Sequence, residues 1–105
     1  MSMNDGAVLD VIEMASYGIG YWASSAVVDE DAKTYTVTEG DFEGRGDTET
    51  FVLTWQALRV AANKLIRFSV PVNRDILASI VNNDVDATAA DVIVQVAAFG
   101  EVRYS

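Results

Sequence analysis

Apolar residues near the start of the chain recur at the spacing of an α-helix. They form a stripe with alternating intervals of four and three residues: Val8, Ile12, Ala15, Ile19 and Trp22. Asp5 precedes this stripe and has a side chain suited to an N-cap, whereas Gly18 and Gly20 each weaken a helix by about 1 kcal/mol relative to alanine. The pattern predicts a helix that begins at Asp5 and kinks or ends at the glycines.

The spacing changes to that of β-strands in the middle of the chain. Residues 34–38 alternate as Thr-Tyr-Thr-Val-Thr, and residues 50–53 read Thr-Phe-Val-Leu, so both runs have high β-propensity. The segment between them, residues 39–49, is rich in glycine and in acids, which is typical of a solvated loop. The two runs are therefore predicted to pair as an antiparallel hairpin.

Helical spacing returns after the second run. Thr54 is a natural N-cap for a stripe that ends before Pro71, and Asn73 can cap a short third helix. The first of these helices is predicted to bury Trp55, Leu58, Ala62 and Leu65, and the short helix is predicted to bury Ile76, Leu77, Ile80 and Val81.

Two interpretations fit residues 88–99. Thr88-Ala-Ala-Asp91 approximates a capping box and Gly100 suits a helix end, which favours a helix, whereas the β-branched run 92–94 would also suit a buried strand. Residues 102–104 are expected to form a short closing strand. The sequence thus predicts an α+β fold, with three or four helices packed on a small antiparallel β-hairpin and a short C-terminal third strand, in a single domain over residues 1–105.

The formal net charge of −9 arises entirely from the first half of the chain. Residues 1–53 contain 11 of the 16 acids and two of the seven bases, whereas residues 54–105 contain five of each. A one-sided negative field repels nucleic-acid phosphates and anionic lipids, and it attracts basic partners. We therefore expect no direct nucleic-acid binding, and a basic protein as the partner.

The missing residue types exclude several kinds of chemistry. The chain has no cysteine and no histidine, so it lacks a thiol nucleophile, the commonest metal ligand and the usual general base at neutral pH. Residues 41–47 have a partial likeness to a calcium loop, but Arg45 and Val52 stand where that loop requires oxygen ligands. No catalytic residue, cofactor or metal site is predicted, and an enzyme that uses carboxylates with a metal ion is the last of the hypotheses.

Gly18-Ile19-Gly20-Tyr21-Trp22-Ala23 matches a permissive dinucleotide-binding pattern, GxGxxA. That motif must follow a strand and open a helix, whereas this stretch follows a helical stripe. The alternative, which the sequence favours, is that the small residues allow the backbone to approach a neighbouring element closely.

Two groups of residues are candidate contact sites. Tyr17, Tyr21 and Trp22 lie within six residues, so a single helical face cannot bury all three, and they are predicted to mediate self-association as a homodimer. The alternative is that Trp22 belongs to the core and the tyrosines are half-buried. The predicted partner-binding acids are Asp29, Glu30, Asp31, Glu39, Asp41, Glu43, Asp47 and Glu49.

No segment has the character of a membrane span or a secretion signal. The longest uncharged stretch, residues 14–28, has 15 residues and includes glycines and serines, which is too short and too polar to cross a bilayer. We expect no membrane insertion and a cytoplasmic location.

Three stretches carry a resemblance to a known group of proteins: Asp10–Ala23 (DVIEMASYGIGYWA), Asp29–Val37 (DEDAKTYTV) and Ala90–Tyr104 (ADVIVQVAAFGEVRY). Together they cover about a third of the chain and resemble small acidic accessory proteins of unknown function from actinobacterial phages and prophages. The resemblance implies a phage accessory role in the host cytoplasm, and it implies no activity or catalytic residue.

Two leading hypotheses follow. In the first, the chain is a non-enzymatic accessory protein whose acidic surface binds a basic, nucleic-acid-binding host or phage protein, in its sharpest form as a DNA mimic. In the second, it is a homo-oligomeric structural or assembly protein whose acidity serves solubility.

Overall fold

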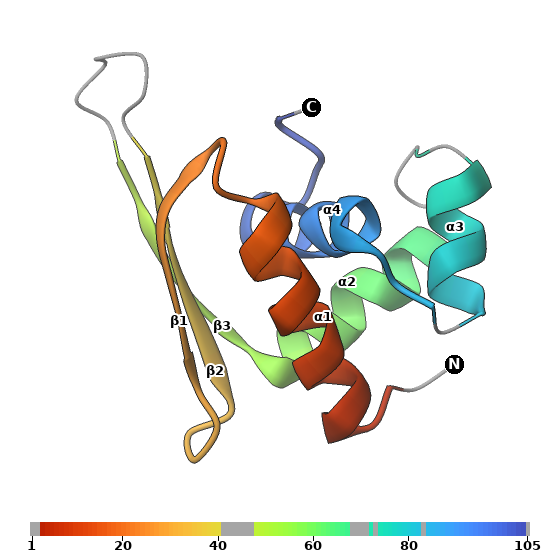
Figure 1. The fold of residues 1–105 in the computed structure, drawn as a ribbon, viewed down its shortest axis with the longest axis horizontal. Helices are drawn as coiled ribbons and strands as arrows, with labels where there is room; N and C mark the ends of the chain where they lie inside the picture. Colours follow the sequence, from red (N-terminus) through yellow and green to blue (C-terminus); the bar gives the residue numbers. More distant parts are fainter. Residues whose placement is uncertain (1–2, 41–47, 68–71, 73, 83, 105) are drawn as a thin grey trace.

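The computed structural model describes the chain except for residues 1–2, 41–47, 68–71, 73, 83 and 105. Four helices lie on one side of a three-stranded antiparallel sheet, so the fold class is α+β (Figure 1). In chain order the elements are α1 (Asp5–Gly18), β1 (Ala23–Asp29), β2 (Thr34–Glu39), β3 (Thr50–Thr54), α2 (Trp55–Ile66), α3 (Arg74–Val81) and α4 (Ala87–Phe99).

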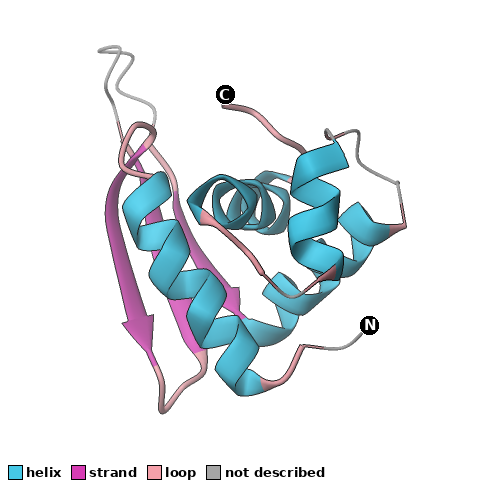
Figure 2. Ribbon diagram, turned by 45° about the vertical axis from the view of Figure 1, so that its right-hand side comes forward, coloured by secondary structure: helices cyan, strands magenta, loops and turns pink. Residues whose placement is uncertain are grey.

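The sheet has the strand order β1-β2-β3, and the predicted hairpin forms its β2–β3 half. Tyr35 and Val37 on β2 and Leu53 on β3 are buried on the face that the helices cover (Figure 2). Alternate residues of β2 are half-buried on the other face, as the period of two in the sequence requires. The alternation of β2 therefore identifies correctly which of its apolar side chains enter the core, whereas Val52 on β3 is apolar and 65% exposed.

The third strand is β1, and the prediction of a C-terminal third strand was wrong. The backbone amides of Arg103 and Tyr104 donate hydrogen bonds to the side-chain oxygen of Gln95, at 2.8 and 2.7 Å, so they bond to a helix side chain instead of a strand. The strand signal of β1 is weak, because its Ala-Ser-Ser start has low β-propensity. Pairing with β2 makes this segment a strand.

The helix ends are set by side-chain caps and glycine. Thr54 caps α2 as predicted, with its hydroxyl accepting from the amide of Ala57 at 3.0 Å. The caps of α1 and α4 differ from the prediction: Asn4 and Asp86 accept from the amides three residues later, whereas Asp5 and Thr88 lie inside the helices. The predicted cap Asn73 lies outside the described residues.

Residues 88–99 are helical, and α4 is the central element of the helical layer. Eight consecutive residues, 89–96, are buried, since α1, α2, α3 and the sheet surround the helix. A helix that is covered on all sides needs no polar face, which explains why β-branched residues fill it. Gly100, with φ 77°, then ends α4 as predicted.

The predicted apolar stripes are buried apart from the end of α3. All five members of the first stripe and all four of the α2 stripe enter the core, although α1 ends before Trp22. On α3, Ile80 is buried, Ile76 and Leu77 pack against the core as half-buried residues, and Val81 is exposed, contrary to the prediction.

One acidic side chain connects the start of α1 to two other elements. Asp5 forms ion pairs with Arg59 of α2 and, at 2.9 Å, with Lys33 in the turn between β1 and β2. These neighbours, Lys33 first, hold the pKa of Asp5 below its ordinary value. Asp5 therefore acts as a junction between both layers of the fold.

Gly18, the last residue of α1, lies close to the start of α4. A Cβ atom at this position would lie 2.7 Å from the backbone carbonyl oxygen of Ala87, whereas a Cβ at Gly20 would meet no atom within 4 Å. The interpretation that small residues permit a close approach is confirmed for Gly18 and does not hold for Gly20. Gly20 lies in the turn after α1, away from this contact.

We expect Gly18→Ala to lower the free energy of unfolding by about 1–3 kcal/mol, because the backbone of Ala87 must move to admit a methyl group. Gly20→Ala is the matched control and is expected to change stability by less than about 1 kcal/mol. Urea denaturation of both variants measures the difference. Equal stability of the two variants would contradict the close contact.

Candidate functional site

The eight acids predicted to bind a partner do not form one surface. Asp29, Glu30 and Asp31 are exposed at the turn between β1 and β2, whereas Glu39 and Glu49 lie at the opposite end of β2. The six residues of β2 separate these ends by about 20 Å. Asp41, Glu43 and Asp47 lie outside the described residues.

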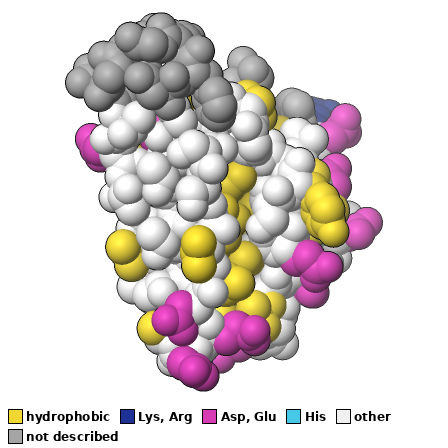
Figure 3. Space-filling model, turned by 60° about the vertical axis from the view of Figure 1, so that its left-hand side comes forward, with side chains coloured by type: hydrophobic (Ala, Val, Ile, Leu, Met, Phe, Trp, Pro, Cys, Tyr) yellow, Lys and Arg dark blue, Asp and Glu magenta, His cyan; other side chains and the backbone are white. Residues whose placement is uncertain are grey.

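Glu39 is not a surface acid, contrary to the prediction. Its side chain is buried, accepts a hydrogen bond from the Tyr104 hydroxyl and lies 3.5 Å from the Arg103 guanidinium. It fastens the C-terminal segment to the sheet. Figure 3, which looks toward the sheet side, shows acidic side chains gathered at the lower end of the molecule and separate hydrophobic side chains above them.

The uncovered strand β1 leads directly into the exposed acids Asp29–Asp31. Every residue of β1 after Ala23 is exposed, including Val28, which faces the same side as the buried Tyr35 that it pairs with. On the other face, Val27 and Val52 flank Thr36 and are 60% and 65% exposed. Within the described part of the chain, no strand pairs with the second edge of β1.

The three aromatic residues predicted to mediate self-association have different environments. Tyr17 is 79% exposed and Tyr21 is 48% exposed, whereas Trp22 is only 1% exposed and stacks on the ring of Tyr104 at 5.6 Å. The alternative interpretation therefore holds for Trp22, which belongs to the core. It cannot contribute to a contact surface together with Tyr17.

A buried carboxylate organises the region around Trp22. Asp91 on α4 is 7% exposed and accepts three hydrogen bonds from neutral donors. Its Oδ1 accepts from Trp22 Nε1 at 2.8 Å and from Gln95 Nε2 at 2.9 Å, and its Oδ2 accepts from the Tyr21 hydroxyl at 2.6 Å. These bonds satisfy a group that would be costly to bury alone.

Gln95, which is fully buried, extends this network to the end of the chain. Its side-chain nitrogen also donates to the carbonyl oxygen of Tyr104 at 3.0 Å. Its side-chain oxygen accepts from the backbone amides of Arg103 and Tyr104. The turn after α1 and the C-terminal segment are therefore both fixed to one face of α4. We call Tyr21, Trp22, Asp91 and Gln95 the Asp91 network.

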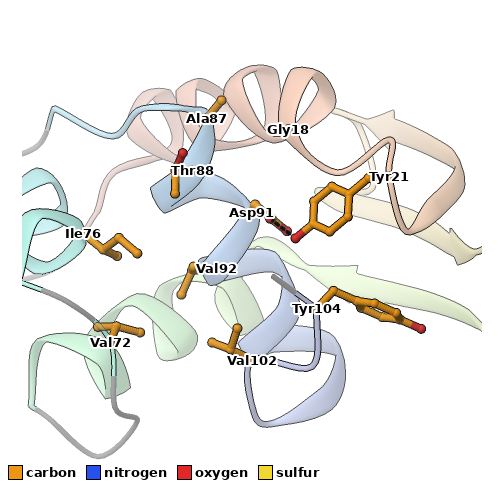
Figure 4. A pocket seen from close by; sticks show the side chains of 10 residues that line it. All are labelled: Gly18, Tyr21, Val72, Ile76, Ala87, Thr88, Asp91, Val92, Val102 and Tyr104. Atoms are coloured by element: carbon orange, nitrogen blue, oxygen red, sulfur yellow. Dashed lines mark hydrogen bonds between the residues drawn. The ribbon is translucent and has the colours of Figure 1, made fainter.

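A pocket of about 510 Å³ opens beside this network. Figure 4 shows its two ends: the Asp91–Tyr21 hydrogen bond lies at one, and Val72 and Ile76 lie at the other. Val92 and Val102 lie between them, and most of the exposed wall is apolar. The complete lining is Gly18, Tyr21, Val72, Ile76, Ala87, Thr88, Asp91, Val92, Val102 and Tyr104. Pockets of this size and character accommodate small organic molecules.

The sequence contains a signal for this site that lies outside the motifs described above. Asp91 and Gln95 are four residues apart in an otherwise apolar run, so they share one face of a helix that is buried on every side. Polar side chains at such positions must find buried partners or line a cavity.

Among the residues that the structure describes, no group of three or more acidic side chains could hold a metal ion. None of the described helices has the length and hydrophobicity to span a bilayer.

The chain matches no protein-family model, no curated protein and no solved structure.

Burial and the neighbouring Asp91 carboxylate raise the pKa of Tyr21 above its ordinary value of 10.0. Above pH 10 the unfolded chain therefore loses this proton while the folded chain retains it, and the folded state loses stability as the pH rises.

We expect the free energy of unfolding of Tyr21→Phe to lie below that of the wild type at pH 8. The difference should become smaller at pH 11, because only the wild type has the hydroxyl whose raised pKa lowers stability at high pH. Urea unfolding at the two pH values measures this gap. Tyr17→Phe removes a solvent-exposed hydroxyl and serves as the control. A gap that does not change with pH would contradict the prediction.

Proposed function

We propose that the chain is a non-enzymatic accessory protein of the phage type that binds a basic protein partner through β1 and the adjacent acidic turn. The observation that supports this most is the combination of an edge strand exposed on both faces with three exposed acids at its end. β3 is the other edge strand of the sheet, but Leu53 on it is buried, and among the described residues Glu49 is the one exposed acid beside it.

The edge of β1 supports strand addition by a partner. Proteins usually protect an edge strand with charged residues, proline, a β-bulge or a covering element. The irregular register of β1 lies at its start, between Ala23 and Ser25, and residues 26–28 contain neither proline nor a charged side chain. An extended segment of a partner can hydrogen-bond to such an edge, and its alternate side chains can contact Val27 on one face or Val28 on the other.

The charge of the region favours a basic partner over a second copy of the chain. Two copies with a net charge of −9 each repel one another, whereas Lys or Arg side chains would complement Asp29, Glu30 and Asp31. This version of the proposal differs from full DNA mimicry, because the acids lie at two ends of the sheet. A homo-oligomer remains the second outcome of the tests below.

The first test neutralises the acidic turn. Asp29→Asn/Glu30→Gln/Asp31→Asn keeps the oxygen at Asp29 that accepts from the amide of Ala32, and it removes three charges. The probe is a capped six-residue peptide of alternating lysine and valine, measured by stopped-flow fluorescence at low and high salt. The association rate of the variant at low salt is expected to fall at least about tenfold.

The matched control removes three acids from another surface. Asp10, Glu13 and Asp84 line a separate depression between α1 and the start of α4, and their amides change the net charge equally. If this control slows association as much as the first variant, general attraction explains the binding and the acidic turn is not the contact.

The second test separates the strand edge from the charge. Val27→Lys on β1 and Val52→Lys on β3 place the same side chain on the same face, on either side of Thr36. We expect Val27→Lys to weaken peptide binding at least about tenfold and Val52→Lys to weaken it much less, because only β1 carries the proposed contact. Hydrogen exchange should show protection of residues 24–28 by the peptide. Equal effects of the two substitutions would contradict the proposal, and sedimentation shows whether a second copy occupies the edge.

A further inference from the structure

The pocket beside the Asp91 network lies away from the proposed partner contact and has the features of a ligand site. We propose that it binds a small amphipathic cation, that is, a protonated amine carried by a compact apolar body. The amine would contact Asp91 and the apolar body would lie against Val92, Val102 and Ile76.

The hydrogen-bond partners of Asp91 leave its negative charge without a counter-charge. Its three donors are a phenol, an indole and an amide, all of them neutral, so they satisfy the carboxylate as hydrogen-bond donors without neutralising it. The ion pairs formed among the described residues involve Asp5 and Glu39 and leave Asp91 without a cationic partner. A buried carboxylate at a pocket wall attracts a cation more strongly than an exposed one, because less water screens it.

The Asp91 carboxylate also has one lone-pair position that the network does not use. A carboxylate offers about four lone-pair positions, and the network uses two on Oδ1 and one on Oδ2. The fourth position belongs to Oδ2, the oxygen that is shared with Tyr21, and both residues line the pocket. An ammonium group can donate to this oxygen without displacing any bond of the network.

The other residues that line the pocket also suit an amphipathic cation. Tyr21 lines the pocket beside Asp91, and the face of an aromatic ring attracts cations. Tyr104 also lines the pocket, but one face of its ring is stacked on Trp22. Among the described lining residues, Val72 and Ile76 form an apolar end whose side chains offer no hydrogen bond to a fully polar ligand, such as a sugar or a nucleotide. An anionic ligand would be repelled by Asp91.

The experiment compares three probes of equal length that differ only in the head group: 3-phenylpropylammonium, 3-phenylpropanol and 3-phenylpropanoate. Binding is followed by NMR through the indole N–H of Trp22, which donates to Asp91 and reports changes at the carboxylate. The ammonium probe is expected to bind at least about tenfold more tightly than the alcohol, and the carboxylate probe is expected to show no saturable binding. Equal affinity of the ammonium and the alcohol would overturn the proposal.

Two isosteric variants locate the interaction. Asp91→Asn should remove the preference for the ammonium over the alcohol, whereas Asp84→Asn, which removes the same charge outside the pocket, should retain it. Loss of the preference in both variants would show that the net charge of the protein attracts the cation, and it would overturn the assignment to Asp91.

A third variant covers the case in which Asp91→Asn does not fold. Thr88 is exposed and lines the pocket, so Thr88→Phe should occupy part of it and weaken the ammonium and the alcohol together. Unchanged affinity of both probes in this variant would overturn the pocket as the site. These outcomes do not depend on the lysine–valine peptide, so this proposal can fail while the β1 contact stands, or the reverse.

Discussion

The burial of the Asp91 carboxylate is the constraint on which the rest of the helical layer depends. Asp91 lies on α4, the one helix that is covered on every side, so its oxygens must accept hydrogen bonds from protein groups. Those donors come from the turn after α1 and from the same helix, while Gln95 bonds the C-terminal segment. The network thereby fixes the positions of two segments that have no regular secondary structure, and it leaves a pocket between them and α3.

The same arrangement explains why polar residues are present in a core that apolar side chains could fill. Replacing the network by apolar groups would leave the amides of Arg103 and Tyr104 without the acceptor that Gln95 provides. A fully satisfied polar network of this kind specifies one arrangement of its segments, because each donor has a defined acceptor. The close contact at Gly18 also helps to specify this arrangement, because it brings the end of α1 against the start of α4.

The two proposed sites use different physical properties of the chain. At β1 the exposed backbone supplies hydrogen bonds and the acidic turn supplies long-range attraction, which suits an extended macromolecular partner. At the pocket, burial strengthens a single charge, which suits a small ligand. Both proposed sites favour cations. The excess of acids in the first half of the chain accounts for this preference at β1 only, because Asp91 lies in the second half, where acids and bases are equal in number.

The sequence by itself determined the elements whose signal is local. The stripes of α1 and α2, the alternation of β2 and β3, the cap at Thr54 and the helix end at Gly100 depend on neighbours within a few residues, and the structure confirms them. Only the tertiary structure decided what depends on distant partners. Pairing with β2 made β1 a strand, Gln95 kept residues 102–104 from forming one, and surrounding elements made residues 88–99 a buried helix. The Asp91 network joins residues about 70 positions apart, such as Tyr21 and Asp91, and no local pattern records a contact over that separation.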